Sequence, residues 1–236
     1  RRLRPIINPA PIDLEEPQLS VAHTPFIGSP QSREKELRFL SVSRPADVAN
    51  INWHPTDVSR LWRYNLHYFD FLRWQSIPAA DKPVYIESWI SANPMGTEDA
   101  WEPYTASLRI VNWIKYFHEY TGEVPREWQL SLINQVHWLS KNMEHHILAN
   151  HLLKNAKALV VAGTWFKGPH GKGFLKQGLD TFLTQIGEQF LPDGGHFERS
   201  PMYHNIALED CLDVYNVLFA QPELAGEQAL TRIHDV

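Results

Sequence analysis

The chain has 236 residues and a mass of 27.3 kDa, more than one minimal domain and less than two full ones at ~100–200 residues per domain. Hydrophobic residues make up 43% and charged residues 21%, which excludes wholesale disorder and a collagen-like fibre. The formal net charge of -5 excludes a nucleic-acid protein held by bulk positive charge. No apolar run approaches the ~20 residues that span a bilayer, so no membrane span is expected.

The ends of the chain and its one cysteine limit what can be said of its compartment. The single Cys211 excludes an intramolecular disulfide and a cysteine-rich zinc site. The chain opens at Arg1 without Met and closes at Val236 directly after a helical stretch, so we interpret it as part of a longer protein. The lack of a visible export signal is then uninformative.

Residues 1–50 contain seven prolines and little periodicity, which favours an extended segment, whereas residues 51–236 have the spacing of helices. Aromatic residues predict a helix from Leu61 that breaks near Pro78. Short connections favour antiparallel helix pairs, and no strand pattern of comparable length occurs. Lys167 to Lys176 is interpreted as a solvated, glycine-rich loop. Further helices are predicted over Pro103 to Tyr120, Trp128–Leu139, Leu152–Trp165, Phe174–Phe190 and Ile206–Phe219.

Three polar clusters interrupt the helical pattern, each near a helix start: 101–109, 150–155 and 193–204. Asn150 fits two interpretations. It is a favoured N-cap for the helix that follows, or an amide that hydrogen-bonds a substrate carboxylate beside outward-pointing backbone N–H groups. The third cluster combines a turn, Asp193-Gly194-Gly195, with many polar side chains, although Ser200-Pro201 also reads as an ordinary helix start.

Asn, Tyr and His together, without an obvious nucleophile, suit removal of a carbon-bound proton beside a uronate carboxylate, followed by loss of the oxygen at C4. An amide such as that of Asn150 can disperse the developing charge by hydrogen bonding. A tyrosine base needs cations or donors nearby, because its ordinary pKa is ~10. Candidates for that role are His151, His196, Arg199 and His204.

Four motifs together resemble the N-terminal helical domain of the heparinase II/III-like polysaccharide lyases, from about Leu61 to Phe219. They are Trp62-Arg-Tyr-Asn-Leu-His-Tyr-Phe-Asp70, Trp101-Glu-Pro-Tyr104, Asn150-His-Leu-Leu-Lys-Asn155 and Asp193-Gly-Gly-His-Phe-Glu-Arg-Ser-Pro-Met-Tyr-His204. The resemblance implies an all-α, incomplete (α/α) toroid followed by a C-terminal β-sandwich, and cleavage of an acidic polysaccharide by β-elimination. It also implies a periplasmic or secreted protein. A further catalytic His is expected from the region that follows this chain in the full protein, and that missing C-terminal region is an expected partner.

By motif, Asn150 resembles the residue that neutralises the carboxylate and Tyr203 the catalytic acid/base, with His151 and His204 as neighbouring candidates. No cofactor is expected, and a structural divalent metal stays open. The predicted substrate-binding residues are Arg199, His196, Glu198, Glu102, Tyr104, Arg109 and Lys154.

Two other functions remain open from the residues. A glycoside hydrolase needs two carboxylates ~5–9.5 Å apart, for which Glu102, Asp193 and Glu198 qualify. A non-catalytic protein of exopolysaccharide assembly would grip an anionic glycan through lysines, including Lys154 and Lys157. A catalytic metal is disfavoured, because no His pair has the spacing that places two ligands on one helical face.

Overall fold

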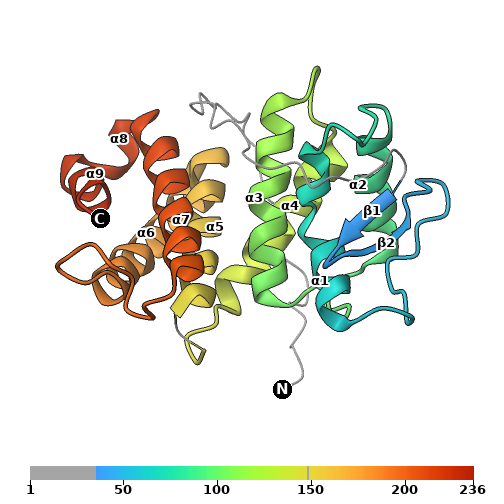
Figure 1. The fold of residues 1–236 in the computed structure, drawn as a ribbon. Helices are drawn as coiled ribbons and strands as arrows, with labels where there is room; N and C mark the ends of the chain where they lie inside the picture. Colours follow the sequence, from blue (N-terminus) through green and yellow to red (C-terminus); the bar gives the residue numbers. More distant parts are fainter. Residues whose placement is uncertain (1–35, 148) are drawn as a thin grey trace. The chain divides into compact units, whose positions relative to one another are not determined.

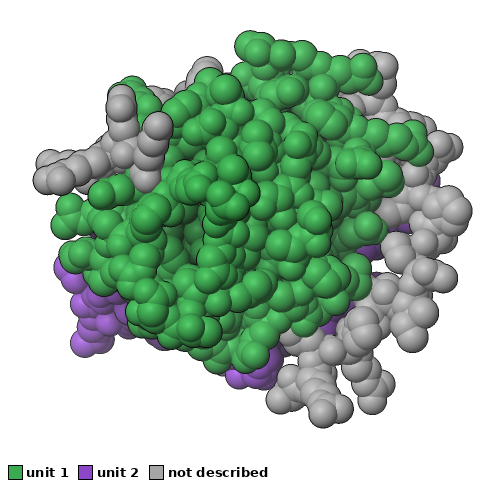
Figure 2. Space-filling model, turned by 90° about the vertical axis from the view of Figure 1, so that its right-hand side faces the viewer, with its two compact units in different colours: residues 1–9, 25–135 green, residues 10–24, 136–236 purple. Residues whose placement is uncertain are grey.

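A computed structural model describes residues 36–147 and 149–236, so the predicted extended segment is described only from residue 36 onward. The described residues are mainly helical, and they divide into two compact units whose boundary lies between Gln135 and Val136. Figures 1 and 2 distinguish the elements and the units. The boundary falls inside one helix, α4 (Arg126–Lys141).

The first unit opens with a hairpin that the sequence did not predict, β1 (Glu36–Phe39) and β2 (Val42–Pro45). The strands pair antiparallel, with Phe39 opposite Val42. Leu40 and Ser41 turn the chain with positive φ angles of 51° and 65°, as a two-residue hairpin turn requires. The inward ring of Phe39 packs on Trp62 and Trp74, with ring centroids 5.1 and 5.6 Å away.

The helices of this unit enclose an aromatic core. They are α1 (Arg60–Tyr68), the 3₁₀ turn η1 (Asp70–Arg73), α2 (Asp81–Ala92) and α3 (Pro103–Glu119). The helix predicted to reach Pro78 instead ends at Tyr68, because Phe69 adopts a left-handed conformation with φ 65°. The turn directs the Phe69 ring into the core, where it meets Trp53, Trp89 and Trp113 at 5.4–6.1 Å.

The second unit is built around α5 (Ala149–Trp165), whose side chains from Leu152 to Trp165 are all buried. It is packed against α6 (Gly168–Gln189) and α7 (Pro201–Phe219), and two short helices follow, α8 (Pro222–Ala225) and α9 (Glu227–His234). Figure 1 shows α5, α6 and α7 side by side. The helices predicted over Leu152–Trp165, Phe174–Phe190 and Ile206–Phe219 are therefore confirmed.

Glycines allow α5 and α6 to approach almost backbone to backbone. A Cβ on Gly163 would lie 2.4 Å from the Leu175 nitrogen, and one on Gly178 would lie 2.7 Å from the Val160 nitrogen. The two contacts run in opposite directions along the chain, so α5 and α6 are antiparallel. The interpretation of residues 167–176 as a loop was wrong, because α6 begins at Gly168, and within this range Gly171 lies where a Cβ would meet the Phe166 carbonyl oxygen.

Candidate active site

Asn150 lies in the first turn of α5, which begins at Ala149. The helix starts three residues before the predicted Leu152, so the interpretation of Asn150 as its N-cap was wrong. Ala149 enters the helix with φ 53°, and the Asn150 side chain is half-buried. An amide in a first turn lies beside N–H groups that have no intrahelical acceptor, a setting that favours anionic ligands.

His151 is held by a buried carboxylate that the sequence analysis missed. Its Nδ1 lies 3.1 Å from Glu144 Oε1, and the Glu144 side chain is only 8% exposed. Asn155, one turn further along α5, holds Glu144 through two hydrogen bonds. Its Oδ1 accepts from the Glu144 backbone N–H at 2.8 Å, and its Nδ2 donates to Oε2 at 3.3 Å. This arrangement orients the imidazole beside Asn150.

The segment that joins α6 to α7 is tied to the start of α5 by Gln189. Its Nε2 donates to the Ala149 carbonyl at 3.0 Å, and its Oε1 lies 3.1 Å from Nε2 of His196. The other imidazole nitrogen, Nδ1, accepts from the Glu198 backbone N–H at 3.4 Å. Burial lowers the pKa of His196, and together with the smaller effect of His204 it outweighs the nearby Glu198, which acts to raise that pKa, so a neutral ring with its proton on Nε2 fits both contacts.

His196 is thus a buried structural residue, 3% exposed, rather than a substrate contact on the surface. Its ring lies 5.8 Å from that of Phe190, and the Phe190 ring lies 6.1 Å from that of His204. Among the described residues, Nδ1 of His204 is buried without a hydrogen-bond partner.

Tyr203 and His204 lie in the first turn of α7, and both are half-buried. As predicted, Ser200-Pro201 begins this helix, with Pro201 at its first position. Glu198 and Arg199 precede it and are exposed, and Arg199 has φ 53°. The two predicted catalytic pairs, 150–151 and 203–204, therefore both stand at helix starts.

Ion pairs show that α5 and α7 run parallel, so that these starts share one end of the unit. Lys154 Nζ lies 2.6 Å from Asp210 Oδ1, and one turn further Lys157 pairs with Asp213. Pairings that advance in the same direction on both helices require parallel axes, as Figure 1 also shows. Lys154 was predicted to bind substrate, but it is buried in this pairing instead.

Arg109 is likewise an internal residue, in the first unit. It is fully buried, donates to the carbonyls of His67 and Ala100, and lies over the Trp89 ring at 4.0 Å. Its Nε donates to Gln135 Oε1 at 2.7 Å. A guanidinium enclosed in this way braces the core of its unit and does not line a groove, contrary to the prediction.

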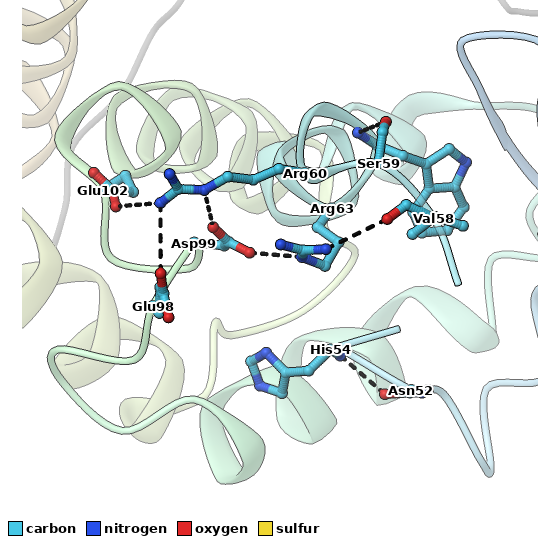
Figure 3. A network of polar contacts seen from close by, with 10 residues as sticks. Asn52, His54, Val58, Ser59, Arg60, Arg63, Glu98, Asp99 and Glu102 are labelled. Atoms are coloured by element: carbon cyan, nitrogen blue, oxygen red, sulfur yellow. Dashed lines mark hydrogen bonds and ion pairs between the residues drawn. The ribbon is translucent and has the colours of Figure 1, made fainter. Parts of the chain in front are cut away.

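Glu102 and Tyr104 lie at the start of α3, also in the first unit. Figure 3 shows Glu102 in an ionic network with Arg60, which lies 3.1 Å away and also contacts the buried Asp99 at 2.7 Å. Arg63 completes it at 2.6 Å from Asp99. Burial acts to raise the pKa of Asp99, but the hydrogen bonds from Arg60 and Arg63 outweigh it and the pKa is lowered.

Across residues 36–147 and 149–236, no three His, Cys, Asp or Glu side chains come together as a metal site would require. Within the same residues, no helix is both long and apolar enough to cross a bilayer.

The chain is similar to known proteins along most of its length. The family model described as "Heparinase II/III N-terminus" matches residues 42–223. A heparin-sulfate lyase of Pedobacter heparinus is 22% identical over 78% of this chain and 36% of its own length. One of Bacteroides stercoris is 24% identical over 64% of this chain and 24% of its own. The chain thus spans about a third or less of these relatives.

Solved structures agree. A crystal structure of heparinase III matches with TM-score 0.62 and 21% identity, over 79% of this chain and 32% of the other. A mutant heparan sulfate lyase from Pedobacter heparinus matches with TM-score 0.63 and 18% identity, over 94% and 40%. At these identities the likeness shows the fold, which is the all-α (α/α) toroid type expected from the sequence. Because the family model covers more than half of the chain, the protein belongs to the heparinase II/III family through its N-terminal domain.

Proposed function

We propose that the protein carrying this chain is a polysaccharide lyase that cleaves a uronic-acid-containing glycan by β-elimination. The observation that carries the proposal is the parallel packing of α5 and α7, which gathers Asn150 and His151 with Tyr203 and His204 at one end of a unit. Membership of the heparinase II/III family supports it. The full-length relatives that match are heparin-sulfate lyases.

In this reaction the Tyr203 phenolate removes the proton from C5 of the uronate. The electron pair left on C5 forms the C4–C5 double bond as the bond from C4 to the glycosidic oxygen breaks. The Tyr203 hydroxyl then returns the proton to that oxygen, so no water is consumed. One phenol thereby serves as base and acid.

Charge on the substrate carboxylate grows as C5 loses its proton, and an amide hydrogen bond from Asn150 stabilises that state more than the ground state. His151 and His204 are the neighbours that orient the substrate or favour the phenolate. Arg199 and Glu198, exposed on the approach to α7, are proposed to contact the glycan.

The test follows the ultraviolet absorbance of an unsaturated uronate when the full natural protein is mixed with a panel of acidic polysaccharides. Wild type is expected to produce the absorbance, and Tyr203→Phe to lower kcat by about 10²–10⁴-fold, the usual contribution of general acid–base catalysis. Asn150→Ala is expected to lower kcat by about 10²–10³-fold.

Matched controls are available on the same helix. Tyr215→Phe removes a phenol three turns from Tyr203, and Asn205→Ala removes an exposed amide; neither is expected to change kcat. Full activity in Tyr203→Phe would contradict the mechanism. Reducing ends without absorbance, abolished by Glu198→Gln, would indicate a hydrolase instead, and binding without cleavage would indicate an assembly protein.

A further inference from the structure

A buried four-residue cluster, Lys154, Lys157, Asp210 and Asp213, joins α5 to α7 behind the candidate active site. Asp210 Oδ1 receives both ammonium groups, at 2.6 Å from Lys154 and 2.9 Å from Lys157. Lys157 also pairs with Asp213 Oδ2. Each of the four side chains is at most 7% exposed.

The cluster is electrically balanced, with two cations and two anions. Burial disfavours the charged form of Lys157, but Asp210 and Asp213 more than offset it and raise its pKa far above the ordinary range. Both lysines therefore serve the interior of the protein. Lysine is usually a surface residue, but these two are buried and are not available to bind an anionic glycan.

Spacing makes the cluster sensitive to helix register. Both the lysines and the aspartates are three residues apart, so each pair presents one face, and the three contacts form with residue 154 level with residue 210. A slip by one turn, about 5.4 Å, that brings Lys157 level with Asp210 would move Lys154 away from Asp210 and Asp213 away from Lys157. Each of these separations draws buried opposite charges apart, which is strongly unfavourable.

The same register fixes the candidate catalytic residues. Asn150 is four residues before Lys154, or about 6 Å along α5, and Tyr203 is seven before Asp210, or about 10.5 Å along α7. Any axial slip between the helices displaces one relative to the other by the same distance. Displacements as small as about 1 Å can cost 10²-fold in rate.

We propose that Lys154, Lys157, Asp210 and Asp213 are positioning residues, which hold α5 and α7 in the register that aligns Asn150 with Tyr203. This inference rests on the proposed function for its catalytic consequence, but not for its structural one. Buried ion pairs often contribute little to stability and can be replaced by apolar residues without loss, so the cluster is expected to matter for alignment more than for folding.

The decisive variant replaces the cluster by apolar residues of similar length, K154M/K157M/D210L/D213L, in the full natural protein. The expected result is a helical protein that melts at the same or a higher temperature, with kcat lowered about 10–100-fold and KM changed less than about threefold. Such a split marks lost transition-state alignment. The matched control is K176M/D180L, which removes an exposed pair on α6 and is expected to leave kcat and KM unchanged.

A register measurement that does not depend on activity accompanies the kinetics. Spin labels at His146 and Asn205, exposed positions near the two helix starts, report their separation by pulsed electron resonance. The quadruple variant is expected to shift or broaden this distance, and the control to keep it. An unchanged distance, or a loss of kcat that merely follows the unfolded fraction, overturns the proposal.

Failure of the proposed function has a different signature. If wild type forms no unsaturated product but the label distance still shifts in the quadruple variant, the lyase assignment is refuted while the register role is supported. Should the quadruple variant not fold, K157M/D213L removes one cation and one anion and keeps Lys154 with Asp210. It is expected to give smaller changes in the same directions, and unchanged distance and kcat would again overturn the proposal.

Discussion

Glu144 is a buried carboxylate with two oriented donors, and it lies seven residues before the histidine that it contacts. Glu144→Gln keeps the shape of the side chain but removes the charge opposite His151. Because the amide of Gln can donate or accept a hydrogen bond, it would hold the His151 ring in either tautomer. We therefore expect kcat for glycan cleavage to fall about tenfold while the protein stays folded. Steady-state kinetics on the purified variant, with circular dichroism as the check on folding, measures this.

The control for that experiment is Glu227→Gln, which removes a carboxylate from the exposed start of α9. It is expected to match wild type. If Glu144→Gln retains wild-type kcat, the contact between Glu144 and His151 has no role in the reaction.

Individual site residues differ in how far the sequence revealed them. Asn150 and Tyr203 stand at helix starts, as their motifs predicted. Glu144 gives no signal, because a single acid in a short connection has no periodicity from which to infer a partner. Lys154 misled the prediction, since lysine is usually exposed; its i, i+3 spacing with Lys157, matched by Asp210 and Asp213, was the available clue.

At the scale of elements, α5 and α6 make the closest backbone approach described above, and two glycines of α6 test it. A Cβ at Gly178 would meet the Val160 nitrogen at 2.7 Å, whereas one at Gly173 has nothing within 4 Å. Gly178→Ala is therefore expected to lower the free energy of unfolding by about 1–3 kcal/mol. Gly173→Ala is expected to raise it by up to about 1 kcal/mol, because alanine restricts the unfolded chain.

Thermal melting of the two variants beside wild type distinguishes them, since the melting temperature should move in opposite directions. If both substitutions raised the melting temperature equally, α5 and α6 would not be in backbone contact at Gly178.

The helices could be predicted because heptad-like spacing of large apolar residues is a strong signal over several turns. The hairpin of β1 and β2 could not, because four-residue strands are too short to display alternation. The start of α6 was also hidden. Glycine and proline are typical of loops in local terms, whereas the close contacts that require Gly171 and Gly178 become visible only in the folded chain.

For the molecule as a whole, buried neutral histidines predict loss of stability in mild acid. Burial lowers the pKa of His67, with Arg109 adding to the effect, and burial also lowers those of His137 and His196. Below the ordinary pKa of about 6.5, the unfolded chain binds protons that the folded protein does not. Stability therefore falls as pH decreases, with a slope approaching about 1.4 kcal/mol per pH unit for His67, whose pKa is lowered most, and smaller contributions from His137 and His196.

Denaturant unfolding of the natural protein between about pH 7.5 and 5 measures that slope. The lowered pKa of Asp99 places its loss of stabilisation below about pH 4, outside this window. His196→Gln is expected to reduce the slope, and the exposed His145→Gln to leave it unchanged. Stability that is independent of pH across the window would contradict the buried neutral state.

The enclosure of α5 has a consequence for how glycan preference could change during evolution or engineering. From Leu152 to Trp165 this helix offers no solvent face, so nearly every substitution along it alters packing. Its accessible first turn carries the residues assigned to the reaction itself. New specificity is therefore expected to be gained with least damage in the exposed stretch at 197–202, where side chains vary at small cost to the folded protein.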